Sequence, residues 1–113
     1  MTLLALDAST KSTGYAIFKD KKLIKYGCLT SAKTNVVERI IYMVEEIKKL
    51  ISEYGIEKIV LEEVLPKNED YDDGANHHSN PKVFKPLMWL QAGINFMIYI
   101  HYKDLEIEYM MPN

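Results

Sequence analysis

Hydrophobic and polar positions follow two different periods along this chain, and each change of period marks a new element. Residues 3–6 form a continuous apolar run that ends at Asp7, so residues 3–7 are predicted to form a buried strand. Two further strands are predicted over residues 14–18 and 23–30, joined by a short charged turn, and such close spacing indicates an antiparallel meander. We therefore expect the first 30 residues to form three strands of one sheet.

The next part of the chain has the period of a helix, over residues 35–54. Thr34 or Asn35 is placed to cap the start of this helix, and Gly55 is placed to end it. Residues 56–64 then have the pattern of a strand, which should lie parallel to another strand because a helical crossover leads to it. The expected buried stripe of the helix has eight members: Val37, Ile40, Ile41, Val44, Ile47, Leu50, Ile51 and Tyr54.

A second helix is predicted over residues 82–102, after a polar stretch without period at residues 66–81 that we expect to be a mobile loop. This helix is apolar nearly all round, with Trp89, Phe96 and Tyr99 on the side that the sheet does not cover. A helix of this kind is buried on two sides, by another subunit or by further chain. The pattern favours a homodimer formed through the second helix.

Residues 105–111 alternate between apolar and polar positions and predict a last strand. The resulting order of strands and helices is typical of an α/β layer with helices packed on a mixed sheet. A length of 113 residues suits one domain. Because no helix follows the last strand to cover it, we expect residues 1–113 to be a single domain that is truncated at its C-terminus.

The composition is that of an ordinary soluble globular protein, with 48% hydrophobic and 27% charged residues. No segment approaches the roughly 18 consecutive apolar residues of a membrane span, so no membrane partner is expected. Cys28 is the single cysteine, which excludes an internal disulfide and favours a cytoplasmic location. The net charge of −2 gives no overall attraction to nucleic acid, so local lysines and metal ions would have to hold a DNA partner.

Two of the predicted strands carry an acid near their end, Asp7 on the first and Glu62 on the fourth. A carboxylate that follows a buried strand needs a cation or a hydrogen-bond network to receive it. Two such carboxylates on parallel strands can converge on Mg²⁺ or Mn²⁺, because hard cations prefer carboxylate oxygens. The alternative is that Asp7 caps the turn that follows it and that Glu62 is an exposed acid on a short strand.

Other polar groups give weaker signals. Ser9, Thr10 and Lys11 follow the first strand and could bind a phosphate through amides, hydroxyls and the lysine charge, but a plain hairpin turn explains them equally well. His77 and His78 are adjacent in the predicted loop and lack the ligand spacing of a zinc site. We expect these two histidines to be solvated.

In order and spacing, these segments resemble the RuvC-type Holliday-junction resolvases. Residues 6–15, with their Asp, small-residue turn and Thr-Gly pair, are similar to the first motif of that family. Residues 59–65 are similar to its second motif, a strand that ends in a metal-binding Glu. Lys67 and Asn68, followed by residues 90–93, resemble the stretch that runs through the family's loop into its second helix.

The resemblance implies a ribonuclease-H-like fold: a mixed sheet of three antiparallel strands plus two parallel strands, with helices packed on it and the C-terminal helix missing. It implies a Mg²⁺- or Mn²⁺-dependent endonuclease that resolves Holliday junctions or other branched DNA as a homodimer, with Asp7 and Glu62 as catalytic, metal-binding residues. Because the family's last two acidic ligands lie on the C-terminal helix, we expect this chain alone to be inactive. The expected nucleic-acid-binding residues are Ser9, Thr10, Lys11, Leu65, Lys67 and Asn68.

Two other classes of function stay open. An actin-like or sugar-kinase-type ATP-binding lobe also begins with a strand, an Asp and a turn rich in Ser and Thr, but here no Gly-rich second phosphate loop accompanies the strand of Glu62. A non-catalytic protein of nuclease fold could bind DNA without cutting it. Stabilisation by ATP would favour the first class, and joint binding of metal and branched DNA would favour the nuclease.

Overall fold

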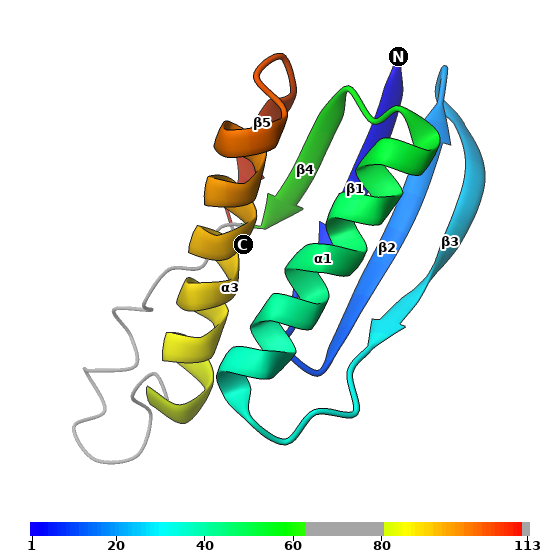
Figure 1. Ribbon diagram of the computed structural model, residues 1–113. Coiled ribbons are helices and arrows are strands. Elements are labelled where there is room, and N and C mark those ends of the chain that lie inside the picture. The colour runs from blue at the N-terminus through cyan, green and yellow to red at the C-terminus, as the bar shows by residue number, and fades with distance from the viewer. Residues whose placement is uncertain (63–80, 112–113) are drawn as a thin grey trace.

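The computed structural model describes residues 1–62 and 81–111, with the backbone alone for residues 81–84. These residues form an α/β fold with one sheet and two helices (Figure 1). The strands and helices confirm the elements predicted from the periodicity, to within two residues at every end. Their bounds are β1 Thr2–Asp7, β2 Ser12–Lys19, β3 Lys22–Thr30, α1 Val36–Tyr54, β4 Lys58–Glu62, α3 Pro81–His101 and β5 Glu106–Met110.

The sheet has the strand order β3-β2-β1-β4-β5. The first three strands form an antiparallel meander, as expected. β4 lies parallel to β1, and β5 lies parallel to β4, so the sheet is mixed. This confirms the prediction that the strand after α1 runs parallel to another strand, because a helical crossover returns the chain to the same end of the sheet.

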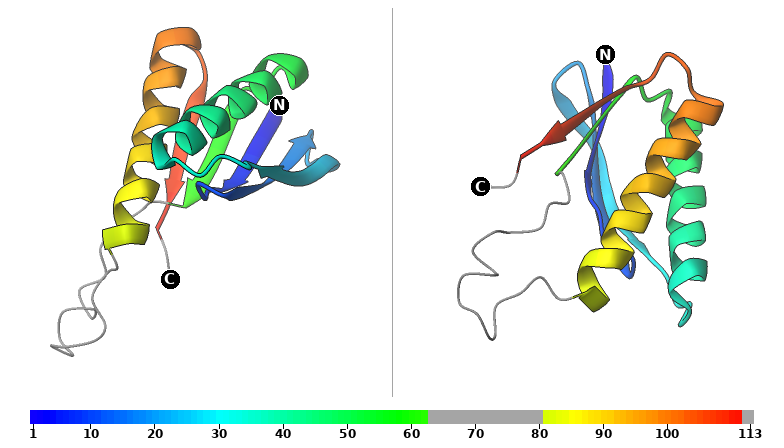
Figure 2. Two further views of the ribbon diagram at one scale, coloured as in Figure 1. Left: turned by 60° about the horizontal axis from the view of Figure 1, so that its bottom comes forward. Right: turned by 90° about the vertical axis from the view of Figure 1, so that its left-hand side faces the viewer.

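Both helices lie on the same face of the sheet (Figure 2). The core lies between this face and the helices, and it includes Leu4, Ile17, Ile59, Ile47 and Ile94, none of which is exposed by more than a trace. Among the described residues, no helix covers the other face. We call that second side the helix-free face of the sheet.

The ends of α1 confirm the predicted caps. Asn35 is the N-cap, and its Oδ1 accepts a hydrogen bond from the backbone N–H of Glu38 at 3.1 Å. Gly55 adopts the left-handed conformation with φ of 60°, and its N–H donates to the carbonyl oxygen of Ile51. Glycine takes this conformation without the cost that a Cβ would add. The caps therefore fix both the length of α1 and the point where the chain turns towards β4.

The predicted buried stripe of α1 was too wide. Val37 and Ile41 are 53% and 56% exposed, whereas Met43, which the prediction left out, is fully buried. The sheet and α3 cover only part of the apolar side of α1, because one helix contacts each neighbour along a limited arc. The two exposed residues lie outside both contacts.

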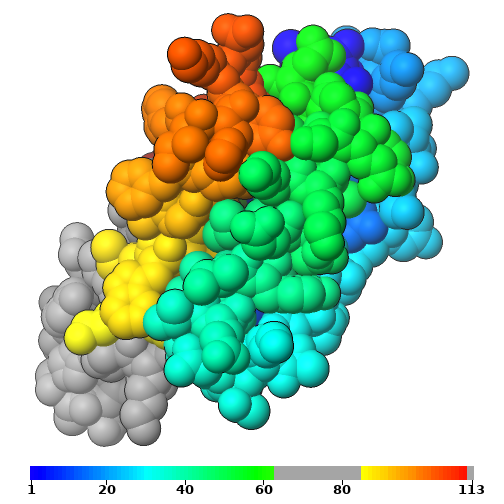
Figure 3. Space-filling view, in the orientation of Figure 1, coloured from blue at the N-terminus to red at the C-terminus, as the bar shows by residue number. Residues whose placement is uncertain are grey.

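The second helix, α3, is apolar on two sides, as predicted. Its inner side buries Leu90, Ile94, Met97 and Ile98 against the rest of the core. Its outer side forms what we call the α3 apolar surface, which consists of five exposed residues: Met88, Trp89, Phe96, Tyr99 and Ile100. Figure 3 shows α3, in yellow to orange, alongside α1 at the molecular surface. No helix among residues 1–62 and 81–111 is long and apolar enough to cross a membrane.

Candidate metal and nucleic-acid site

Asp7 and Glu62 end two neighbouring parallel strands at the same edge of the sheet. Leu6 on β1 pairs with Leu61 on β4, and each acid is the next residue along its strand. Neighbouring strands lie about 4.8 Å apart, so the two acidic side chains start side by side. The structure thus places together the two residues that the sequence singled out.

Both acids point to the helix-free face. Successive side chains of a strand point to opposite faces of the sheet. Leu6 and Leu61 are buried beneath the helices, so the residue after each of them points the other way. Asp7 and Glu62 are accordingly exposed, and a hydrated ion or a large substrate can reach them from solvent.

Two exposed carboxylates are a donor set that suits Mg²⁺ or Mn²⁺. Mg²⁺ prefers oxygen ligands and is usually held by one or two carboxylates, with water and substrate phosphates completing its shell. In the described part of the chain, no three His, Cys, Asp or Glu side chains gather closely enough to hold a metal by themselves. Asp7 and Glu62 therefore fit an ion shared with a phosphate, and not a closed structural zinc site, which needs four protein ligands.

Hydrogen bonds from one side chain and from the backbone hold the turn after β1 in place. Thr13 Oγ1 accepts a hydrogen bond from the N–H of Ser9 at 3.1 Å and donates one to the carbonyl oxygen of Ser9 at 2.6 Å. The N–H of Ser31 donates to the carbonyl oxygen of Lys11 at 3.0 Å. Lys11 is exposed, Ser9 is half-buried, and Thr10 is 8% exposed. The Lys11 ammonium is open to an anion, whereas Thr10 is largely withdrawn from solvent.

Some of the residues singled out in the sequence lie outside the described residues. They include Leu65, Lys67 and Asn68, which the resemblance suggests for DNA contacts, and the two histidines His77 and His78. The candidate site that the structure describes consequently rests on β1, β4 and the turn after β1.

Strand pairing adds a row of neighbours that the sequence alone did not indicate. Asp7 pairs with Gly14 on β2, and Gly14 pairs with Cys28 on β3. On the other side, Glu62 pairs with Met110 on β5. These five residues form one row across the helix-free face. The row depends on the register of four strand pairings, two of which join segments far apart in the sequence, and no local pattern of a single sequence contains that register.

A second charged cluster lies on the same face, further from the carboxyl ends of the strands. Lys58 Nζ on β4 lies 3.1 Å from a carboxylate oxygen of Glu106 and 3.0 Å from one of Glu108, both on β5. Hydrogen bonds to Glu108 and then to Glu106 raise the pKa of Lys58 above its ordinary value of 10.5. Lys58 thereby offsets part of the negative charge on the face that carries Asp7 and Glu62.

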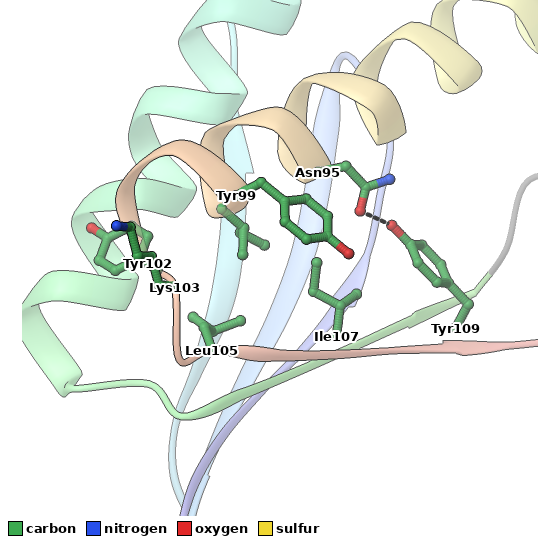
Figure 4. Close-up of a pocket in the computed structure, with 8 residues that line it drawn as sticks. Asn95, Tyr99, Tyr102, Lys103, Leu105, Ile107 and Tyr109 are labelled. Carbon is green, nitrogen blue, oxygen red and sulfur yellow. Dashed lines mark hydrogen bonds between the residues drawn. The ribbon is translucent and has the colours of Figure 1, made fainter.

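A small cavity of about 120 Å³ lies between the end of α3 and β5 (Figure 4). Tyr109 of β5 donates a hydrogen bond to Oδ1 of Asn95 on α3 at its wall. Ile107 and Tyr109 pack towards the helices, so this cavity lies on the other side of the sheet from Asp7 and Glu62. It belongs to the contact between α3 and β5 and is not part of the candidate metal site.

Comparison with known proteins identifies the fold. No protein-family model matches the sequence, and neither does any curated protein. Among solved structures, the Thermus thermophilus RuvC in complex with a Holliday junction substrate superposes with a TM-score of 0.74, at 10% identity, over 99% of this chain and 65% of that one. Another T. thermophilus RuvC structure gives a TM-score of 0.69, at 11% identity, over 99% of this chain and 64% of that one.

The yeast mitochondrial Holliday junction resolvase Ydc2 gives a TM-score of 0.63, at 14% identity, over 97% of this chain and 50% of that one. The fold is that of the RuvC-type resolvases. This confirms the ribonuclease-H-like architecture predicted from the sequence. Since the identities are low and the chain spans 65% or less of these three structures, the likeness to RuvC and Ydc2 extends to the fold and not to a particular activity.

Proposed function

We propose that this protein is a metal-dependent, structure-selective endonuclease that cuts Holliday junctions or other branched DNA by phosphodiester hydrolysis. The observation that carries the proposal is the placement of Asp7 and Glu62 side by side, exposed, at the carboxyl ends of the parallel strands β1 and β4. Ligands of α/β sheets bind at this edge. The RuvC-type fold supports the same reading, because one solved RuvC structure holds a Holliday junction substrate.

Asp7 and Glu62 would bind Mg²⁺ or Mn²⁺, which supplies an activated water and stabilises the leaving oxygen in phosphodiester hydrolysis. Both side chains are exposed on one face, so a DNA strand can approach them without a movement of the helices. The exposed Lys11 lies in the turn directly after Asp7 and can offset phosphate charge. The two contacts of Thr13 with Ser9 hold that turn in a fixed shape while DNA binds.

DNA contacts beyond the two acids form part of the same proposal. The turn after β1 would contribute through the exposed Lys11 and through backbone beyond Ser9, since the N–H of Ser9 already donates to Thr13 and the Thr10 side chain is buried. Contacts of this kind fix the position of the phosphate backbone without reading base sequence. The residues proposed to bind DNA are Ser9 through its hydroxyl group, Thr10 through its backbone, and Lys11, Leu65, Lys67 and Asn68 through their side chains.

We further propose that the protein acts as a homodimer through the α3 apolar surface. Large exposed apolar patches on soluble proteins commonly mark interaction sites, and Trp and other aromatic residues dominate the energy of many interfaces. Val37 and Ile41 are two further exposed apolar residues, on α1, which contacts α3. A second copy is the occupant that suits branched DNA, because a two-fold dimer presents two equivalent sites to the two equivalent strands of a four-way junction.

The expected cellular location follows from the substrate and from the single cysteine. A nuclease for branched DNA has to share a compartment with DNA. Cys28 is exposed and unpaired, which suits a reducing compartment. We therefore propose that the protein is cytoplasmic.

Mn²⁺ binding tests the metal site directly. Asp7→Asn and Glu62→Gln should each weaken Mn²⁺ binding, measured by electron paramagnetic resonance. Loss of a group that merely hydrogen-bonds to a metal ligand costs roughly 10–100-fold in metal affinity, so loss of a ligand itself should cost at least as much. Glu106→Gln is the matched control, because it removes an acid from the same face at the other end of the sheet. Equal Mn²⁺ affinity in the parent and all three variants would contradict the proposed site.

Cleavage tests the reaction itself. The complete gene product should cut a labelled four-way DNA junction with Mg²⁺ or Mn²⁺, and Asp7→Asn should stop cutting while junction binding persists. If Mg-ATP instead raises the melting temperature and the junction does not, the turn after β1 serves an ATP-binding lobe. If the protein binds the junction and Mn²⁺ but does not cut, it is a DNA-binding protein of nuclease fold.

A further inference from the structure

Gly14 lies within β2, yet the fold gives no conformational reason for a glycine there. Its φ is not positive, since Gly55 is the glycine with positive φ in the described part of the chain. A Cβ added at Gly14 would lie 3.7 Å from Cβ of Asp7, an ordinary contact, and would meet no other atom within 4 Å. The break in register between β2 and β3 occurs between Ile17 and Phe18, so Gly14 is not part of that irregularity. The protein itself would accept an alanine at this position.

A glycine inside a strand has a cost. It loses more backbone entropy on folding than other residues and offers no side chain for packing. Glycines in strands are therefore often found at bulges, at bends, or where a ligand or another backbone approaches closely. At Gly14 the register excludes a bulge, and the place of this residue in the sheet supports the approach of a ligand.

That place is directly beside the proposed metal ligand. Gly14 lies between Asp7 on β1 and Cys28 on β3, in the row that crosses the helix-free face. Its neighbour Thr13 is fully buried on the helix side, so the hydrogen that replaces a side chain at Gly14 faces the same way as Asp7. The row thus has a gap next to Asp7, with the exposed Cys28 on its far side.

We infer that Gly14 is a positioning residue, whose missing side chain lets a phosphodiester of DNA lie against the backbone of β2 beside Asp7 and Glu62. The inference deepens the proposed function and rests on it. A methyl group at Gly14 would fill the gap and hold the phosphate away from the carboxylates, although it would leave the fold and both acids intact. Gly14 has no chemical part in hydrolysis; it determines how close the substrate comes.

Substitution at Gly14 tests this with two sizes of side chain. Gly14→Ala and Gly14→Val should keep the Mn²⁺ affinity of the parent and melt at the same or a higher temperature, because both residues suit a strand better than glycine does. Junction cleavage by the complete gene product should fall about tenfold with alanine and about 100-fold with valine, as expected when a reacting group is displaced by about 1 Å. The matched control is Ala16→Ser, which adds one heavy atom on the same strand and face and should cleave as the parent does.

The single cysteine gives a second readout, which does not depend on cleavage. A four-way DNA junction at saturating concentration should slow the alkylation of Cys28 by iodoacetamide in the parent, because bound DNA would cover the row beside Asp7. In Gly14→Val the same DNA should protect Cys28 less than it does in the parent, because the phosphate would lie further from the row. Mass spectrometry reports the site without ambiguity, since the sequence has one cysteine.

The possible outcomes separate this inference from the proposed function. A parent that binds neither Mn²⁺ nor the junction would overturn both. A parent that binds both, together with a Gly14→Val protein that cleaves at the parent's rate and shows the same protection of Cys28, would overturn the inference alone. A lower melting temperature for Gly14→Ala would also overturn it, because the fold itself would then require glycine.

Discussion

Thr13 and Ser9 close the turn after β1 through one hydroxyl group. Thr13 Oγ1 accepts from the N–H of Ser9 and donates to the carbonyl oxygen of the same residue, and Thr13 has no exposed surface. A single buried side chain thus satisfies both polar backbone groups of Ser9. Since Ser9 is two residues after Asp7, this pair of hydrogen bonds fixes how the chain leaves the candidate metal site.

Thr13→Val should destabilise the protein although it preserves the shape of the side chain. It leaves the N–H and the carbonyl oxygen of Ser9 without their partner, and an unsatisfied buried polar group costs about 1–3 kcal/mol. Urea unfolding should show this loss as a lower midpoint. Thr13→Ser is the control, because it keeps the hydroxyl and loses one methyl group. Equal stability of the valine variant and the parent would mean that water replaces the hydroxyl.

The sequence was sufficient to predict the elements, because their apolar periods differ clearly. The parallel pairing of β4 also followed from the sequence, since a helical crossover leads to it. Asp7 and Glu62 could be singled out because each ends an apolar strand. What placed them on one face was the pairing of Leu6 with Leu61, a contact between segments 55 residues apart in sequence.

Contacts between distant elements account for what the sequence did not predict. The apolar stripe of α1 shows which side can be buried, but Val37 and Ile41 stay exposed because the neighbouring elements do not extend over them. The sequence gives no sign that Lys58 forms ion pairs, because its partners Glu106 and Glu108 lie on β5, about 50 residues further along the chain. Register and coverage are properties of the assembled sheet, and a local pattern does not contain them.

The proposed dimer should be sensitive to a charge in the α3 apolar surface. Phe96→Glu should weaken self-association by about 30-fold or more, because losing a central aromatic contact commonly costs about 2 kcal/mol. Phe96 is 66% exposed, so the monomer should fold normally with this change. Sedimentation velocity over a range of concentrations measures the effect.

Tyr26→Glu is the matched control for the dimer. Tyr26 is an aromatic residue of similar exposure, 74%. It lies on β3, at the edge of the sheet opposite β5 and away from α3 (Figure 1). Its replacement should leave self-association unchanged. A parent protein that stays monomeric at the highest concentration would contradict the dimer through α3, and equal effects of the two glutamates would point to another surface.

Lys58→Met should lower stability near neutral pH by a small amount. It removes the charge between Glu106 and Glu108 but keeps most of the aliphatic stem. The pKa of Lys58 is raised in the folded protein, so its stabilisation is complete below the ordinary value of 10.5 and is lost as the pH rises through the higher folded value. The difference in melting temperature between parent and variant should therefore be constant from pH 7 to about pH 10 and shrink above that range.

Lys22→Met, at an exposed position on β3, provides the comparison for this pH series. It removes the same charge without touching Glu106 or Glu108. Its melting temperature should follow that of the parent across the whole range. A Lys58→Met protein as stable as the parent at pH 7 would show that the two ion pairs contribute nothing measurable, as is common for exposed pairs.

Loss of a metal ligand normally weakens substrate binding, but after divalent metal is removed it should strengthen the binding of DNA to this protein. Without a cation, the charges of Asp7 and Glu62 repel the phosphates that approach the helix-free face. Asp7→Asn combined with Glu62→Gln should therefore bind a four-way junction more tightly than the parent in EDTA. The expected gain is about fivefold for each charge removed, since two charges about 4 Å apart in water interact by about 1 kcal/mol. The gain should fade near 1 M salt, where the screening length is about 3 Å.

A second double variant separates local repulsion from overall charge. Glu45→Gln combined with Glu53→Gln removes the same net charge from the exposed side of α1, on the opposite side of the sheet. Its affinity for the junction in EDTA should stay close to that of the parent, because these charges are separated from the helix-free face by the thickness of the protein. Fluorescence anisotropy with a labelled junction measures both variants. Equal gains in junction affinity for the two double variants would show that DNA responds to the net charge alone. That result would contradict the helix-free face as the DNA-binding surface.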